Sequence, residues 1–393
     1  MRGIEVPERG EDFSADPVEL FFDLGYVLAF SQLVSRLVHD PTWSGVGRSA
    51  LLLWLLWLPW TQFTWSANAV SGNGRRVRLL FLTGTAACIP MAASVSTAFE
   101  GGGPVFALSL AGIYALALGT MGLAIEQHPA MRPALIRLAG ASLGSVAILV
   151  VGAFLDGDAR LVAWIVSALV VIAGLAQAGQ GEWIVRTGHF AERHGLILII
   201  ALGEVVVAIG KPVADGLEAG DGVPGSTLVA LLGAGVFAGV LWWSYFDRPG
   251  PALEHRGEGV EGDQARGRFA RDVYTVGHVP LVAGIILAAA GLEEMALHPD
   301  DVVPLSFRLL LAGGLVLGVV GVVAGVWRAF RVVARERLVG GAVIVAVLVL
   351  AADVQGAWLI VLVDVVLLVA LAVEHVRIER PRPQGAVTPA VSA

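Results

Sequence analysis

The chain has 393 residues, of which 56% are hydrophobic and 15% charged, and its formal net charge is -7 at pH 7. With a mean hydropathy of +0.77, this composition excludes a soluble globular protein and indicates an integral membrane protein. The single cysteine, Cys88, excludes an intramolecular disulfide. The expected fold class is therefore all-α, a polytopic bundle of transmembrane helices.

The first predicted span, residues 18–38, is long enough to cross a bilayer yet carries Glu19 and Asp23. These carboxylates lie four residues apart and so share one helical face, which Tyr26 continues. Lipid does not accommodate ionisable groups, so we expect this face to meet protein or water and to bind substrate or ion. Glu19 also has a structural interpretation, as a favourable charge in the first helical turn.

Residues 1–17 precede this span as a polar cytoplasmic segment without the apolar core or cleavage site of a signal peptide. Eleven further apolar segments follow, each near the length that a bilayer requires: 49–70, 78–98, 104–125, 134–155, 159–177, 195–211, 226–246, 273–291, 306–328, 338–354 and 356–374. The sequence thus predicts about twelve transmembrane helices. The last two segments adjoin so closely that one broken helix would also fit.

The distribution of basic residues supports this count. Of the 26 Lys and Arg residues, 21 lie in the termini and alternate loops that begin with the N-terminus, and five lie in the opposite loops. The positive-inside rule then predicts that both termini are cytoplasmic. One span more or fewer would disturb the alternation.

Weak internal matches favour two six-helix repeats. The motif at Glu19 resembles that at Glu192, the tryptophan-rich second span resembles the eighth, and Pro90 corresponds to Pro280. Halves six spans apart have equal orientation and are related by an axis along the membrane normal. We therefore divide the chain as follows: a first half (18–177), a connecting loop (178–194), a second half (195–375) with a long, flexible cytoplasmic loop (247–272), and a disordered C-terminal tail (376–393).

Aromatic and small residues inside the spans suggest further contacts. Trp57 and Trp60 lie too deep for interfacial anchoring. They would either line a cavity, where indole faces can hold cations, or pack a bulky core, and packing is the favoured alternative. Glycines four residues apart favour close helix contacts; these pairs are Gly140 with Gly144, Gly314 with Gly318, and Gly321 with Gly325.

Two carboxylates fall deep inside later spans. Glu204 lies near the middle of the seventh span, and Asp364 lies at a comparable depth in the twelfth. At that depth a carboxyl group must be paired, protonated or hydrated, which makes both residues candidate proton carriers. His278 and His375 are candidate partners for them, although an interfacial position explains either histidine as well. We expect Asp23, Glu204 and Asp364 to converge on one water-accessible cavity.

Motifs for other chemistry are missing from the sequence. There is no HExxH, CxxC or Walker motif, and the histidines are scattered. We therefore expect no catalytic residues, no metal, no cofactor and no nucleic-acid partner, and not an enzyme.

Five stretches, in order, resemble the bacterial low temperature requirement A (LtrA) family: PVELFFDLGYVLAF at 17–30, the tryptophan-rich second span, HFAERHGLILIIALGEVVVAIG at 189–210, WWSYFD at 242–247 and HVPLVAGI at 278–285. The resemblance covers about residues 17–375 and implies a multi-pass protein of the bacterial inner membrane, in a family named for a cold-growth phenotype. It implies no particular substrate. Glu19, Asp23, Glu192 and Glu204 match acidic positions of the family, whereas Gly25 and Tyr26 depart from its usual Val-Phe.

The expected function is a proton-coupled secondary transporter of an unknown small molecule or ion, in contact with membrane lipid. Glu192 and Arg193 are expected in the loop before the seventh span, as gating residues. A cation channel is the alternative, since Phe22-Asp23 resembles part of the Phe-Ser-Asp motif of two-repeat lysosomal potassium channels. A membrane enzyme or sensor in cold adaptation is the third class, and the missing catalytic constellation argues against it. The sequence does not indicate an oligomeric state.

Overall fold

The computed structural model describes residues 15–70, 74–125, 128–178, 181–218 and 222–379. Within these ranges the chain forms helices joined by short connections and no strand, with one isolated bridge between Val302 and Gln355. The all-α prediction is confirmed. Residues 1–14 of the predicted N-terminal segment 1–17 lie outside the described residues, as does the tail from 380 onward, while 376–379 continue the last helix.

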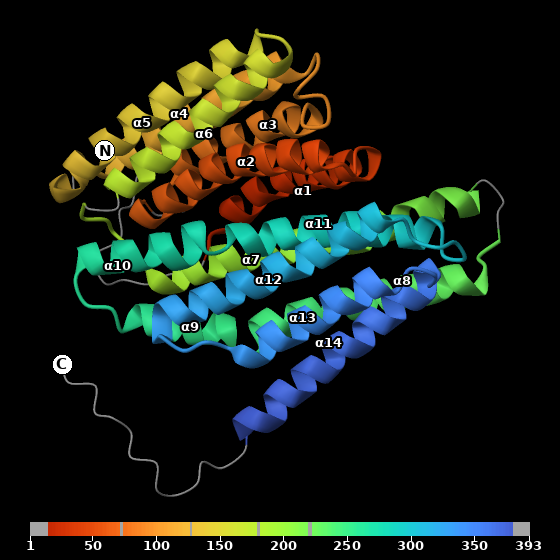
Figure 1. The fold of residues 1–393 in the computed structure, drawn as a ribbon. Coiled ribbons are helices and arrows are strands. Elements are labelled where there is room, and N and C mark those ends of the chain that lie inside the picture. Colours follow the sequence, from red (N-terminus) through yellow and green to blue (C-terminus); the bar gives the residue numbers. More distant parts are fainter. Residues whose placement is uncertain (1–14, 71–73, 126–127, 179–180, 219–221, 380–393) are drawn as a thin grey trace, which may run out of the picture.

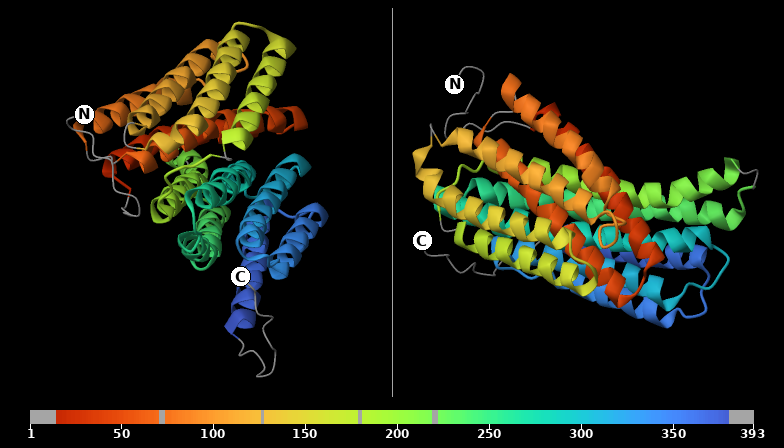
Figure 2. Two further views of the ribbon diagram at one scale, coloured as in Figure 1. Left: turned by 90° about the vertical axis from the view of Figure 1, so that its left-hand side faces the viewer. Right: turned by 90° about the horizontal axis from the view of Figure 1, so that it is seen from above.

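Two groups of helices lie side by side (Figures 1 and 2). The first group comprises α1 (Pro17–His39), α2 (Trp43–Ala69), α3 (Arg75–Ala93), α4 (Gly103–Ala124), α5 (Arg132–Ala153) and α6 (Gly157–Ala178). The second comprises α7 (Thr187–Glu218), α8 (Gly225–Phe246), α9 (Pro249–Glu258), α10 (Asp263–Phe269), α11 (Val279–Leu297), α12 (Leu305–Phe330), α13 (Arg335–Leu350) and α14 (Gly356–Glu379). The short helices η1 (Pro129–Met131) and η2 (Ala270–Val276) precede α5 and α11.

Each predicted span coincides with one of these helices. Ten helical stretches in the described residues are long and apolar enough to cross a membrane. Of the helices that correspond to the twelve predicted spans, α2 and α13 are not among these ten. α13 has only 16 residues, and the tryptophans and polar side chains of α2 lower its mean hydropathy. A multi-pass helical membrane protein is thus established, while the count of twelve spans and the six-helix repeat stay predictions.

Two connecting segments differ from expectation. Residues 247–272, expected as a flexible loop, contain α9 and α10 and run into η2, because apolar residues such as Leu253 and Phe269 are buried against the bundle. α7 begins at Thr187 rather than at residue 195, so Glu192 and Arg193 lie inside a helix. Their assignment to a connecting loop was wrong.

Glycines permit the closest helix contacts. A Cβ atom on Gly314 of α12 would lie 2.5 Å from the carbonyl oxygen of Gly284 on α11, so only glycine allows these backbones to approach. A Cβ atom on Gly321 would meet Leu281 in the same interface. Gly140 and Gly144, by contrast, have open space around their Cα atoms, and the predicted contact there is wrong.

The first group meets the second chiefly through α1, which contacts both α7 and α11. α1 and α7 run parallel, because contacts between them advance together along both helices, from Glu19 with His189 to Ser31 with Glu204. Among the candidate spans, those containing α7 and α11 are the most buried. The α1–α7 interface is therefore the central place where polar groups of the two helix groups meet.

Candidate functional site

A buried ionic network joins the first turns of α1 and α7. Nη2 of Arg193 donates to Oδ1 of Asp23 at 2.8 Å, and its Nε lies 3.6 Å from Oε2 of Glu19. Nε2 of His189 lies 3.0 Å from the same Glu19 oxygen. All four side chains are buried, and each helix contributes two groups spaced by four residues, so two complementary faces meet.

Glu19 also caps its own helix. Its side chain accepts from the backbone N–H of Asp16, whose side chain accepts from the backbone N–H of Val18. The structure thus shows the structural role that the sequence allowed for Glu19 together with its ionic contacts. The Glu19 carboxylate therefore both caps the N-terminus of α1 and connects α1 to α7.

Asn68 of α2 determines which ring nitrogen of His189 carries the proton. The backbone N–H of Arg186 donates to Oδ1 of Asn68 at 2.8 Å, so the amide nitrogen of Asn68 faces Nδ1 of His189 at 2.9 Å. That nitrogen can only donate, which leaves Nδ1 of His189 as the acceptor and places the ring proton on Nε2. His189 in this arrangement is neutral and donates to Glu19.

The negative charges of the network therefore outnumber its positive charges. Glu19 and Asp23 contribute two negative charges when ionised, Arg193 contributes one positive charge, and His189 is neutral. Oδ2 of Asp23 and Nη1 of Arg193 are buried without hydrogen-bond partners among the described residues. One proton on either carboxyl would bring these four side chains to neutrality, the form that a low-dielectric interior favours.

The tryptophans of α2 pack around this network. Nε1 of Trp60 donates to Oδ1 of Asp23 at 2.8 Å, and the guanidinium of Arg193 lies 5.9 Å from the Trp60 ring centroid. Nε1 of Trp57 donates to the carbonyl oxygen of Thr275 at 2.7 Å, and the two indole rings lie 4.8 Å apart. Both tryptophans are buried, as the packing alternative predicted, and Trp60 additionally binds the carboxylate.

Two histidines extend the polar region toward α11. Nε2 of His278 accepts from the hydroxyl of Tyr245 at 2.7 Å, since its Nδ1 lies 3.0 Å from the carbonyl oxygen of Val273 and must donate there. The ring of His194 lies 5.1 Å from that of His278. His278 thus pairs with a tyrosine rather than with a carboxylate.

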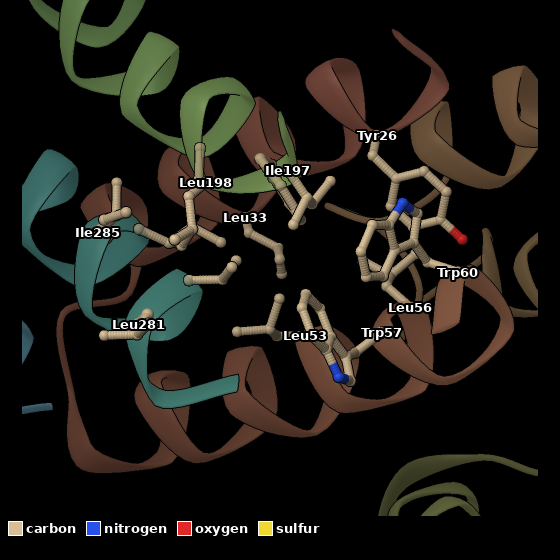
Figure 3. Packing of buried hydrophobic residues seen from close by; sticks show 14 of the residues in the cluster. Tyr26, Leu33, Leu53, Leu56, Trp57, Trp60, Ile197, Leu198, Leu281 and Ile285 are labelled. Carbon is tan, nitrogen blue, oxygen red and sulfur yellow. The ribbon is translucent and has the colours of Figure 1, made fainter. Parts of the chain in front are cut away.

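An apolar layer separates this network from the middle of the bundle. It consists of Leu33, Leu53, Ile197, Leu198 and Ile285, which are all buried and point toward one another from α1, α2, α7 and α11 (Figure 3). Along α7, Ile197 and Leu198 lie between Arg193 and Glu204. In the described conformation these apolar side chains therefore separate the polar groups around Arg193 from Glu204.

Glu204 lies beyond the apolar layer. Its side chain is buried, and its Oε2 accepts from the hydroxyl of Ser31 on α1 at 2.6 Å. Its Oε1 has no hydrogen-bond partner among the described residues. Glu204 is thus a deep carboxyl group with a hydroxyl partner and no ion pair within the described part of the chain.

Asp364 and Tyr26 complete the predicted set. Asp364 of α14 is buried against α8 beside Gly233, and its Oδ1 lacks a partner among the described residues. The hydroxyl of Tyr26 is likewise buried without such a partner. Asp23 and Glu204 share the α1–α7 interface at different depths, whereas Asp364 lies in another interface, because α14 packs chiefly on α8.

Two cavities adjoin the site. A cleft of about 600 Å³ at the start of α7 is lined by Glu192, Tyr245, Phe246 and Glu254 among others. Glu192 also accepts from the backbone N–H of Ala15 at 2.6 Å, so it ties the start of α1 to α7. A second, apolar cavity lies between α7, α8 and α11 to α14. Neither of these two cavities is lined by Asp23, Glu204 or Asp364, so neither is the shared cavity expected from the sequence.

Within the described part of the chain, no group of three or more His, Cys, Asp or Glu side chains could hold a metal ion. His375, a candidate partner for the deep carboxylates, instead lies 3.1 Å from the guanidinium of Arg248. The site is a set of hydrogen-bonded acids, bases and hydroxyls. Such a set can hold and pass protons.

Sequence reasoning missed His189, Asn68 and Ser31. The signal for His189 was present, because His189 and Arg193 repeat the four-residue spacing of Glu19 and Asp23 with complementary chemistry. Asn68 and Ser31 carried no signal, since single polar residues in apolar helices are common. Only the packing of α1 against α2 and α7 gives them a role.

Comparison with known proteins identifies the family. The description "Bacterial low temperature requirement A protein (LtrA)" matches residues 14–373. The chain belongs to the LtrA family. It is also 28% identical over 397 residues to the uncharacterized protein RA0937 of Rhizobium meliloti (strain 1021), and the match covers 96% of this chain and 93% of that protein. No solved structure matches the chain.

LtrA membership gives the buried network its context. Glu19, Asp23, Glu192 and Glu204, the acidic residues in two of the stretches that resemble the family, all lie on α1 and α7. The two helices that carry these acids are thus the two that pair through Arg193 and Ser31. The similar Rhizobium protein is uncharacterized, so it assigns no substrate to this LtrA protein.

Proposed function

We propose that this LtrA protein is a proton-coupled secondary transporter of a small molecule or ion in the bacterial inner membrane. The observation that carries the proposal is Glu204, a buried carboxyl group that accepts a hydrogen bond from the Ser31 hydroxyl. An ionised carboxylate at membrane depth is costly without a cation, so the group is best accommodated when it carries a proton. A group that must gain and lose a proton can couple proton movement to transport.

The arrangement along α7 supports the same function. The Asp23–Arg193 network lies on one side of the apolar layer and Glu204 on the other. A secondary transporter needs polar groups that become accessible from opposite sides in turn, with a closed barrier between them. Packing changes of the layer around Ile197 and Leu198 would connect or separate the two polar regions.

The cation channel remains the alternative function. A channel needs a continuous polar path in its conducting state, and the apolar layer interrupts the path in the described conformation. Uptake driven by a gradient, in contrast with passive current, separates a transporter from a channel.

The test is transport by purified protein in liposomes, with Glu204→Gln as the variant. Metabolite profiling of a deletion strain first selects candidate substrates. The wild-type protein should accumulate the substrate when a proton gradient is imposed. Glu204→Gln should fall to the level of protein-free liposomes while still exchanging labelled for unlabelled substrate, because an amide keeps hydrogen bonds but carries no proton.

Glu294→Gln is the matched control. Glu294 lies on α11 and pairs with His298, 3.4 Å away, in a partly exposed position. This variant should accumulate substrate as the wild type does. Full proton-driven uptake by Glu204→Gln would contradict the proposal, and so would passive ion current through the wild-type protein.

A further inference from the structure

Four arginines line one cavity at the end of the second helix group where α12 ends. The cavity has a volume of about 290 Å³ and is formed by α9, α10 and the last turn of α12, which packs on α9 (Figure 1). The chain reaches it from two segments far apart in the sequence. The arginines that line it are Arg256, Arg268, Arg328 and Arg331.

Two of these arginines are held in place by hydrogen bonds to the protein. Nε of Arg256 donates to the carbonyl oxygen of Ala329 at 3.2 Å, and Nε of Arg328 donates to Oδ2 of Asp272 at 2.9 Å. The two terminal nitrogens of each guanidinium donate to no other group within the described residues. Both side chains are thus oriented by the protein, while their terminal N–H donors can bind a ligand.

The other two arginines contact the protein less. Arg268 is exposed and forms no hydrogen bond or ion pair with the residues that the structure describes. Arg331 is also exposed, and its guanidinium lies 4.6 Å from the ring centroid of Trp327. A contact with the face of an aromatic ring uses the positive charge but none of the N–H donors. These two side chains can therefore donate to a ligand as well.

The acidic residues of this region do not neutralise the cavity. Asp272 is shared by two arginines, with Oδ1 at 2.6 Å from Nη2 of Arg271 and Oδ2 at 2.9 Å from Nε of Arg328. Among the described residues, the other acids of α9, α10 and the start of α13 do not line the cavity; they are Glu254, Glu258, Glu261, Asp263 and Glu336. The wall of the cavity is therefore strongly positive, which suits an anionic ligand.

The cavity also lies at the level where a membrane span ends. α12 belongs to a candidate span, Leu305–Phe330, and its end is on the side that the arginine distribution predicts to be cytoplasmic. Large apolar side chains beside the cavity are exposed: Trp327, Phe330, Val332 and Val333. A soluble ligand would need no such surroundings, whereas the acyl chains of a lipid would contact them. Basic pockets between helices at this face of a membrane are typical sites for anionic lipids.

We propose that the four arginines bind the phosphate group of an anionic lipid headgroup, with the acyl chains lying along Trp327 and Phe330. The planar guanidinium group matches the oxygen atoms of a phosphate, which can accept two parallel hydrogen bonds from it. Membrane orientation alone would require positive charge at this face. It would not require four arginines around one cavity, two of them oriented by hydrogen bonds through Nε.

The experiment is native mass spectrometry of the purified full-length protein in a neutral detergent, titrated with dioctanoyl phosphatidylglycerol. This lipid should bind more tightly than dioctanoyl phosphatidylcholine, because the arginines repel the choline cation. Arg268→Gln should weaken binding of phosphatidylglycerol about tenfold or more, the usual effect of losing a hydrogen bond to a charged group. Arg331→Gln should weaken it too, which gives a second variant should Arg268→Gln fail to fold.

Arg335→Gln is the matched control. Arg335 is exposed at the start of α13, close in sequence to Arg331, but it does not line the cavity. This variant should weaken binding by less than about twofold, because a charge that does not touch the ligand is screened by solvent and salt. Equal losses in Arg268→Gln and Arg335→Gln would overturn the cavity as a binding site, and so would equal affinity for the two lipids.

Glycerol 3-phosphate separates a lipid from a soluble phosphate compound. It carries the phosphate group without acyl chains, so it should displace dioctanoyl phosphatidylglycerol only weakly. Displacement at similar concentrations would show that the cavity holds a soluble phosphate compound, and the lipid assignment would then be wrong. Neither Glu204 nor a transported substrate enters these measurements, so their outcome is independent of the transport proposal.

Discussion

Arg193 is the residue on which the buried network depends. It is fully buried and contacts both carboxylates of α1, at 2.8 Å from Asp23 and 3.6 Å from Glu19. Two carboxylates within one helical turn would repel each other without it. A buried ion pair of this kind contributes little net stability when complete, but its disruption leaves an uncompensated charge.

Arg193→Gln should therefore destabilise the protein by about 3–5 kcal/mol, the usual effect of removing one partner of a buried ion pair. The measurement is the unfolding of purified protein in mixed micelles. Adding Asp23→Asn to Arg193→Gln should recover part of the loss, because one uncompensated charge is then removed. Arg76→Gln, an exposed position on α3, should change stability by less than about 0.5 kcal/mol. Unchanged stability in Arg193→Gln would show that the network adds nothing to the folded state.

At the scale of the elements, α11 and α12 are held together by backbone contact rather than by large side chains. Gly284 and Gly314 face each other so closely that a Cβ atom on either would lie 2.5 Å from the carbonyl oxygen of the other. Dispersion contacts of this kind drive helix association in lipid, where the hydrophobic effect does not.

Gly314→Ala and Gly313→Ala test this interface as neighbouring substitutions. Gly314→Ala should force α11 and α12 apart and destabilise the protein by about 1–3 kcal/mol. At Gly313 an added Cβ atom meets nothing within 4 Å, so Gly313→Ala should be neutral or stabilising by up to about 1 kcal/mol. Thermal unfolding of both variants gives the comparison. Equal effects would mean that the helices are not packed through Gly314.

At the scale of the whole molecule, two helix groups meet through α1, α7 and α11. Their outer surfaces expose large apolar side chains, including Leu232, Val339 and Trp358, as lipid contact requires. The basic residues follow the positive-inside pattern, with 21 of 26 in the loops expected at the cytoplasmic face. This asymmetry predicts that both termini are cytoplasmic.

Single new cysteines should report that orientation, because Cys88 is fully buried and will not react with a membrane-impermeant maleimide. In right-side-out vesicles we expect labelling of Asp156→Cys and Asp300→Cys, which are exposed and precede α6 and α12. Glu258→Cys, at the end of α9, should label only after the vesicles are opened. Labelling of Asp156→Cys and Asp300→Cys from opposite faces would contradict the number of spans predicted between them.

The sequence by itself determined the membrane class, the positions of the long helices and the family, because long apolar runs have few alternatives to spanning a bilayer. It also marked Glu19, Asp23 and Glu204 as unusual, since each places a carboxyl group in an apolar helix. It did not determine their partners. Lipid-facing and core-facing residues are equally apolar in such helices, so periodicity does not show which faces meet.

Only the tertiary structure decided those partners. It paired Asp23 with Arg193 and Ser31 with Glu204, which lie 170 and 173 residues apart in the chain. It also separated Asp364 from both carboxylates, since α14 packs chiefly on α8. These contacts follow from the parallel packing of α1 against α7 with α11 alongside, an arrangement that close backbone approach and buried polar pairing select among many ways of packing similar apolar helices.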